Sequence, residues 1–237
     1  MSICAVIPCS YRHVGVVKDA VHSILLQTHP VSTVVVRFSS MGRCPPRHAH
    51  LPEDPRIVTN CTLERESTGE VRNKAVRECR GEQYITFLDG DDMALPYAVQ
   101  RMISLMQRNN ASVGIHDYFP KYQRKVVRNH TELVPHFTAG KLPPFNIDAH
   151  MSHSTVRRDV LIPQRNLTIG EDSWFVNDLW ARNATFVYTA EKLTLYIDRA
   201  PRARARRAPT YDRSARTTRR RKTWREKLNA IRQAIFD

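Results

Sequence analysis

Apolar and polar positions follow one another along the first half of the chain in blocks that predict strands and helices in turn. Apolar runs typical of buried parallel strands occupy four segments, 3–7, 33–38, 56–59 and 84–88. Apolar residues recur at helical spacing in three further segments, 14–25, 71–79 and 95–106. Strands that alternate with helices indicate βαβ units, so we expect an α/β fold with a mostly parallel central sheet flanked by helices.

After residue 112 the pattern changes to short strand-like pieces around a single helix. The pieces are 113–118, 154–157, 185–188 and 194–197, and the helix is 175–182. No linker rich in Gly, Ser or Pro separates the two halves, so we predict a single domain over residues 1–198.

Residues 199–237 differ in composition and are predicted to be an Arg-rich tail that ends in a short amphipathic helix. From 199 to 227 there are 13 Lys or Arg residues and two acidic ones, which accounts for most of the formal net charge of +14. The domain itself carries little net charge, so we expect no specific nucleic acid partner. The apolar stripe of the predicted helix consists of Trp224, Leu228, Ile231 and Ile235.

Three interpretations of this tail stay open. A basic stretch before an amphipathic helix suits peripheral contact with an anionic membrane surface. The helix could instead dock on the domain, or the arginines could bind polyanions without specificity.

The cysteines bear on the compartment in which the protein works. The five cysteines include no C-x-x-C pair, which favours reduced thiols. We therefore expect a cytoplasmic protein, with the membrane's cytoplasmic face as the site of any attachment.

The strongest chemical signal is a cluster of carboxylates, Asp89, Asp91 and Asp92, directly after the predicted strand 84–88. Ligands of α/β sheets bind at the carboxyl ends of parallel strands. Carboxylates so close together repel one another unless a cation accompanies them. Oxygen ligands suit Mg²⁺ or Mn²⁺, which can bridge to a diphosphate. The alternative interpretation is a solvated acidic turn.

Two further segments gain significance beside this cluster. Glu171 and Asp172 open the predicted second-half helix, where they could cap it or supply a general base. Arg72 lies near the start of the helix 71–79, where it could hold phosphate or simply be a surface arginine.

Taken together, these segments resemble the family-2 glycosyltransferases of the GT-A fold. The resemblance covers roughly residues 3–198 and is carried by 5–11 (AVIPCSY), 23–30 (SILLQTHP), 69–75 (GEVRNKA), 84–92 (YITFLDGDD, a DXD motif) and 170–172 (GED). It implies an inverting hexosyl- or pentosyltransferase that moves a single sugar from a nucleotide sugar, with UDP as the expected nucleotide. The acceptor would be a glycan, a lipid-linked molecule or a protein.

The resemblance also implies roles for individual residues. Asp172 would be the general base, with Glu171 as its neighbour in the catalytic pair. Asp91 and Asp92 would hold Mn²⁺ or Mg²⁺. The nucleotide would contact Pro8, Ser10, Tyr11, Arg72, Asp89 and Asp91.

One departure from the family pattern concerns the nucleotide base. The family commonly ends its second strand with Asp-Asp-Gly-Ser, in which an Asp holds the base. Here the corresponding stretch, 36–40, reads VRFSS and contains no carboxylate. Two rival functions also remain, a nucleotidyltransferase and a catalytically inert GT-A-like domain with a polyanion-binding tail.

Overall fold

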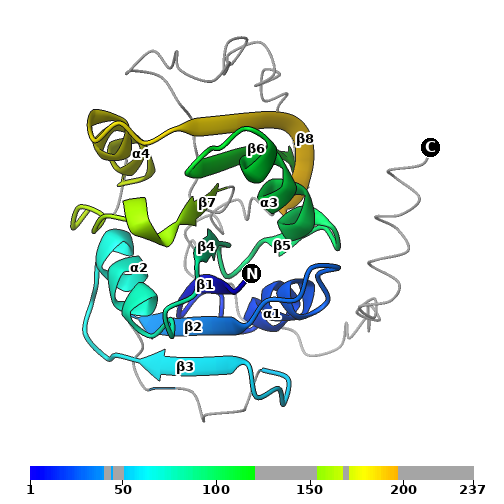
Figure 1. The fold of residues 1–237 in the computed structure, drawn as a ribbon. Helices are drawn as coiled ribbons and strands as arrows, with labels where there is room; N and C mark the ends of the chain where they lie inside the picture. Colours follow the sequence, from blue (N-terminus) through cyan, green and yellow to red (C-terminus); the bar gives the residue numbers. More distant parts are fainter. Residues whose placement is uncertain (40–43, 45–50, 121–153, 168–170, 197–237) are drawn as a thin grey trace, which may run out of the picture. The chain divides into compact units, whose positions relative to one another are not determined.

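The computed structural model describes residues 1–39, 44, 51–120, 154–167 and 171–196 (Figure 1). Its helices are α1 (Val17–Leu25), α2 (Thr68–Arg77), α3 (Ala98–Arg108) and α4 (Glu171–Ala181), and a short 3-10 helix spans Arg158–Val160. Its strands are β1 (Ile3–Ser10), β2 (Thr33–Ser39), β3 (Ile57–Cys61), β4 (Tyr84–Phe87), β5 (Met93–Ala94), β6 (Val113–Pro120), β7 (Ser154–Arg157) and β8 (Phe186–Tyr196).

Within the described residues the strands form one sheet of eight, in the order β3-β2-β1-β4-β7-β6-β8-β5. β3, β2, β1 and β4 run parallel to one another, whereas β7 pairs antiparallel with both β4 and β6. The chain passes from β1 to β2 on one side and later returns to β4 on the other. The carboxyl ends of β1 and β4 therefore flank a topological switch point, the place where open α/β sheets bind ligands.

Alternate residues of the central strands feed two apolar cores, one on each face of the sheet. Ile3, Ala5 and Ile7 pack with α1 and α3, whereas Cys4 and Val6 pack with α2 and α4. Figure 1 shows the same division, with α1 and α3 on one side of the strands and α2 and α4 on the other. Both faces of β1 are thus covered, which explains why its sequence is apolar without a period of two.

The structure confirms the α/β fold class and locates a strand or helix at each segment predicted before residue 198. It differs in two details. The pieces 185–188 and 194–197 belong to one long strand, β8, whose pairing with β6 is irregular around Asp117. The two-residue strand β5 was not predicted, because two residues carry no readable period. The predicted tail and its helix lie outside the described residues.

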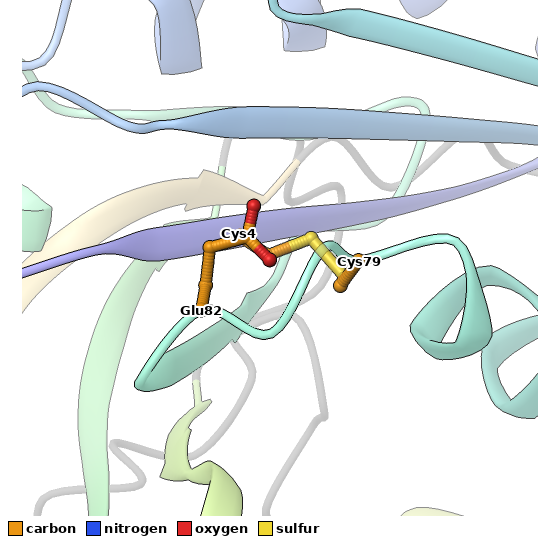
Figure 2. A group of neighbouring side chains, drawn as sticks. All are labelled: Cys4, Cys79 and Glu82. Carbon is orange, nitrogen blue, oxygen red and sulfur yellow. A yellow bond between two sulfur atoms is a disulfide. The ribbon is translucent and has the colours of Figure 1, made fainter.

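Four of the five cysteines form disulfides, so the expectation of reduced thiols is wrong for them. Cys4 on β1 bonds to Cys79, which follows α2, and Cys44 bonds to Cys61 on β3. Figure 2 shows the first bond beside the carboxylate of Glu82. The packing of α2 on β1 brings Cys4 and Cys79 together across 75 residues, a distance along the chain at which spacing gives no signal.

None of the helices in the described part of the chain has the length and hydropathy of a membrane span.

The first turn of α2 is packed unusually closely against the segment that precedes α4. A Cβ atom on Gly69 would lie 2.0 Å from the backbone oxygen of Arg165. Asn73, one turn later, donates to the Gln164 carbonyl and accepts from the Gln164 amide, both at 2.7 Å. These contacts hold α2 at a defined position relative to the chain that enters α4.

We predict that Gly69→Ala lowers the free energy of unfolding by about 1–3 kcal/mol, the usual cost of overpacking, because the new methyl group must displace backbone. Urea denaturation would measure the loss. Gly15→Ala is the matched control, since a Cβ there meets nothing within 4 Å. Equal stability of the two variants would contradict the close packing of α2.

Candidate active site

A cavity of about 910 Å³ opens where β1, β2 and β4 end, and the first turns of α2 and α4 complete its wall. The lining contains all but one of the predicted site residues, namely Pro8, Ser10, Tyr11, Arg72, Asp89, Asp91, Glu171 and Asp172. Residues from four distant segments thus meet at the switch point of the sheet.

The parallel pairing of β1 with β4 brings the first two of these segments together. The amide of Gly90 donates to the carbonyl of Pro8 at 3.2 Å, just beyond the last paired residues of the two strands. A Cβ on Gly90 would lie 2.8 Å from that same carbonyl oxygen. The glycine of the Asp-Gly-Asp turn therefore allows Asp89 and Asp91 to emerge beside Pro8 and Ser10.

Arg72 joins the other segments, because its guanidinium contacts three carboxylates. One terminal nitrogen lies 2.9 Å from Asp89, and the other lies 2.6 Å from Asp172 and 3.4 Å from Glu171. The arginine side chain is only 2% exposed. We call these four residues the Arg72 cluster.

Charge balance explains why the Arg72 cluster can be buried. Burial alone would lower the pKa of Arg72, but the charges of Asp89 and Asp172 outweigh it and raise that pKa above its ordinary value. Burial, followed by the charge of Asp172, raises the pKa of Glu171. Glu171 is thus the member of the cluster on which a proton is held more strongly than on an ordinary glutamate.

Local sequence fixes where α2 presents Arg72. Ser67 caps the helix by accepting from the amide of Glu70, and the Glu70 carboxylate accepts from the amide of Ser67. With Gly69 and Asn73 held against the segment 164–167, the capped helix begins at a fixed point. Arg72, one turn in, then faces the carboxylates instead of solvent, so the structure does not support its interpretation as a surface arginine.

The two aspartates predicted to hold a metal are placed differently. Asp91 lines the cavity, with a carboxylate oxygen 3.4 Å from the Nε2 atom of His13. Asp92 is 1% exposed and lies outside the lining, and its amide closes the turn by donating to the Asp89 carbonyl at 3.0 Å. The structure therefore brings Asp91 to the cavity, whereas Asp92 is buried outside its lining.

Within the part of the chain that the structure describes, three or more potential metal ligands gather closely only at Cys4, Cys79 and Glu82. Their two sulfur atoms are bonded to each other, so that group offers no thiolates (Figure 2). Of the two aspartates predicted to hold the metal, Asp91 is the one that lines the cavity and would supply a carboxylate to a catalytic cation. One carboxylate together with substrate phosphates is an ordinary ligand set for Mg²⁺, so the residues present fit such an ion.

The end of β1 and the segment after it also line the cavity. Tyr11 is 57% exposed and accepts a hydrogen bond from Nε of Arg12 at 3.0 Å. Cys9 also lines the cavity, but burial and then the charge of Asp91 raise the pKa of its thiol to about 12. Because the thiolate is the reactive form, Cys9 is not suited to act as a nucleophile at neutral pH.

Glu66, a further carboxylate in the lining, was missed in the sequence. It precedes the cap of α2 and pairs with Arg37 of β2 and with Lys74. A signal existed, because an arginine in the middle of an apolar strand requires a buried partner. The sequence did not say which acidic residue would supply it.

A family profile matches residues 4–163, and its description is glycosyl transferase family 2. The chain belongs to this family. The match ends before α4, so Glu171 and Asp172 lie beyond it and are placed by the structure alone. No curated protein matches the chain at the sequence level.

Solved structures of TarS from S. aureus share the fold of this chain. A crystal structure of residues 1–349 in complex with UDP matches at a TM-score of 0.63 and 15% identity, over 84% of this chain and 61% of that one. The structure of the same segment in complex with UDP-GlcNAc matches at a TM-score of 0.58 and 13% identity, over 85% and 60%. The chain thus spans about three fifths of these TarS segments, and the likeness establishes a GT-A fold.

We predict that Arg72→Leu lowers the free energy of unfolding by about 3 kcal/mol, because removal of one partner leaves buried carboxylates without their cation. The difference in the free energy of unfolding between the wild type and Arg72→Leu should become smaller as the pH falls from about 7 to about 5. Crowded carboxylates bind protons more tightly in the folded state than in the unfolded state, so a lower pH favours folding. Urea denaturation across this pH range measures both effects.

Arg77→Leu is the matched control, since Arg77 is an exposed arginine on the same helix. If both variants were equally stable at every pH, the guanidinium of Arg72 would not be what holds the carboxylates together.

Proposed function

We propose that the protein transfers a single sugar from a UDP-sugar to an acceptor hydroxyl, with inversion at the anomeric carbon. The observation that carries the proposal is the convergence of Asp89, Asp91 and Asp172 on one cavity at the switch point of a family-2 fold. The UDP and UDP-GlcNAc complexes of TarS support a uridine nucleotide as the carrier. The acceptor would be a glycan, a lipid-linked molecule or a protein.

The nucleotide would bind across the carboxyl ends of β1 and β4. Pro8, Ser10 and Tyr11 offer backbone and side-chain contacts along one wall, and Tyr11 presents an exposed ring on which a base can lie. Asp89, which emerges beside Pro8, would also contact the nucleotide. Arg72 would act chiefly by orienting Asp89, because the Arg72 guanidinium already pairs with the carboxylates of Asp89 and Asp172.

Asp172 would accept the proton from the acceptor hydroxyl as that oxygen attacks the anomeric carbon. Its carboxylate lines the cavity, and its Oδ1 atom accepts a hydrogen bond from Arg72 that fixes its orientation. Attack from the side opposite the diphosphate inverts the configuration. A carboxylate is a weak base for a hydroxyl, so stabilisation of charge in the transition state must supply much of the rate enhancement.

Asp91 would hold a divalent cation, Mn²⁺ or Mg²⁺. Such an ion, when bound, acts as a Lewis acid on the diphosphate oxygens and neutralises the departing nucleotide. Asp91 lines the cavity together with Ser10 and Asp89, and the phosphates of a bound nucleotide would lie beside these residues. Attachment of the predicted tail to a membrane remains a prediction, whereas the two disulfides remove the argument from reduced thiols on which a cytoplasmic location was expected.

The first test offers the protein Mn²⁺ and a panel of UDP-sugars, and measures the release of UDP. Slow hydrolysis should identify the donor even without an acceptor. Asp172→Asn should retain UDP affinity in calorimetry but reduce release by about 100-fold or more, the lower range for loss of a general base. Asparagine keeps an oxygen that can accept from Arg72, so the cluster should persist.

Asp178→Asn is the matched control, because Asp178 lies on the same helix and pairs with Arg165 outside the cavity lining. An active Asp172→Asn enzyme beside an inactive Glu171→Gln enzyme would transfer the role of base to Glu171. Release of pyrophosphate would favour a nucleotidyltransferase, and UDP binding without turnover would favour an inert domain.

We predict that Asp91→Asn weakens the binding of Mn²⁺ in the presence of UDP by about tenfold or more, since loss of even a secondary contact to a metal site has that effect. Electron paramagnetic resonance of free Mn²⁺ measures this without reference to turnover. Asp159→Asn, which alters an exposed carboxylate outside the cavity lining, should bind Mn²⁺ as the wild type does. Unchanged Mn²⁺ affinity in Asp91→Asn, with full activity in EDTA, would refute the metal role.

A further inference from the structure

The end of β2 carries a reversed charge compared with the pattern of the family. Where an aspartate is expected to hold the nucleotide base, Arg37 occupies the strand, and its side chain is buried. Its guanidinium donates to Glu66 through Nη2 at 2.7 Å and through Nε at 3.2 Å. The two parallel bonds present the Glu66 carboxylate in a fixed plane.

This carboxylate is ionised and faces the cavity. Burial opposes the ionisation of Glu66, but hydrogen bonds from Arg37 and Lys74 outweigh it and hold its pKa below the ordinary value. The side chain is 3% exposed and yet belongs to the cavity lining. The space it faces is therefore the cavity and not bulk solvent.

One oxygen of Glu66 retains capacity for a further donor. Oε1 accepts from both Arg37 and Lys74, at 2.7 and 2.6 Å, whereas among the described residues Oε2 accepts the longer bond from Nε of Arg37 alone. A carboxylate oxygen can accept two hydrogen bonds, so Oε2 can take another from a ligand.

The strand order places Glu66 at the end of the cavity where a base would lie. β2 lies beside β1 on the side away from β4, and the carboxylates of the Arg72 cluster lie on the β4 side. A nucleotide whose diphosphate crosses the ends of β1 and β4 therefore extends its base toward β2. Ser39, the last residue of β2, lines the cavity there together with Glu66.

We propose that Glu66 reads the base of the nucleotide by accepting its ring N–H, in place of the aspartate that β2 lacks. This inference rests on the proposed function. Uracil presents an N–H at N3, whereas cytosine presents an unprotonated nitrogen at the same position and would face the carboxylate with a repulsive lone pair. Glu66 thus selects UDP over CDP, and Arg37 and Lys74 are positioning residues that hold the carboxylate.

The test measures UDP and CDP affinities by calorimetry with Mn²⁺ present, in the wild type, Glu66→Gln and the control Glu64→Gln. Glu64 is an exposed glutamate two residues away that does not line the cavity. The wild type and Glu64→Gln should prefer UDP by about tenfold or more, the value of one hydrogen bond to a charged group. Glu66→Gln should lose most of that preference.

A ligand-side change separates base reading from a purely structural role. UDP methylated at N3 lacks the ring N–H, so it should bind the wild type about tenfold or more weakly than UDP does, and Glu66→Gln with a much smaller difference. If Glu66→Gln fails to fold, Glu66→Asp retains the charge that Arg37 needs and withdraws the carboxylate by one methylene. Glu66→Asp should also lose most of the preference for UDP over CDP and for UDP over N3-methylated UDP.

Equal weakening of UDP and CDP by the Glu66 variants would overturn the inference and leave the proposed function standing. Failure of the wild type to bind UDP at all would overturn both.

Discussion

The site depends on one buried arginine that holds three carboxylates from separate parts of the chain. Asp89 lies 17 residues from Arg72, and Glu171 and Asp172 lie 99 and 100 residues away. Two unit charges about 4 Å apart repel by about 4 kcal/mol at a dielectric constant near 20, so these carboxylates could not share a cavity wall without a cation. The guanidinium supplies that charge, and its planar fork also sets the directions in which the carboxylates point.

Much of the surrounding structure serves to place this arginine. The cap of α2, the close contact of Gly69 with Arg165 and the paired hydrogen bonds of Asn73 fix the start of the helix that carries it. The pairing of β1 with β4 brings Asp89 to one nitrogen of the guanidinium, and the start of α4 brings Asp172 to the other. The carboxylates of this acidic turn would repel one another in isolation, but with the guanidinium of Arg72 beside them they form part of the lining of a polar cavity.

A second buried ion pair, between Arg37 and Glu66, lies along the same cavity on the side of β2. Buried pairs of this kind contribute little net stability, because the loss of hydration offsets the attraction between the charges. Their presence at a ligand cavity is therefore better explained by the direction in which they hold a carboxylate. The Arg72 cluster lies on the β4 side of the cavity, and the pair of Arg37 and Glu66 lies on the side nearest β2.

The sequence by itself determined the order of most strands and helices of the domain, with β5 and the continuity of β8 as the exceptions, because apolar periodicity reports directly which face of an element is buried. It also singled out segments that meet at one cavity, because Asp89, Asp91 and the pair Glu171 and Asp172 are clustered acidic residues at the ends of predicted elements. Tertiary structure decided the rest. Only packing shows that Asp92 is buried outside the cavity lining, that Arg72 contacts three carboxylates, that Cys4 reaches Cys79, and that Arg37 of β2 pairs with Glu66 at the cavity. Each of these four observations depends on contacts between residues far apart in the chain or on the placement of one side chain. Such contacts and placements leave no periodic pattern in the sequence.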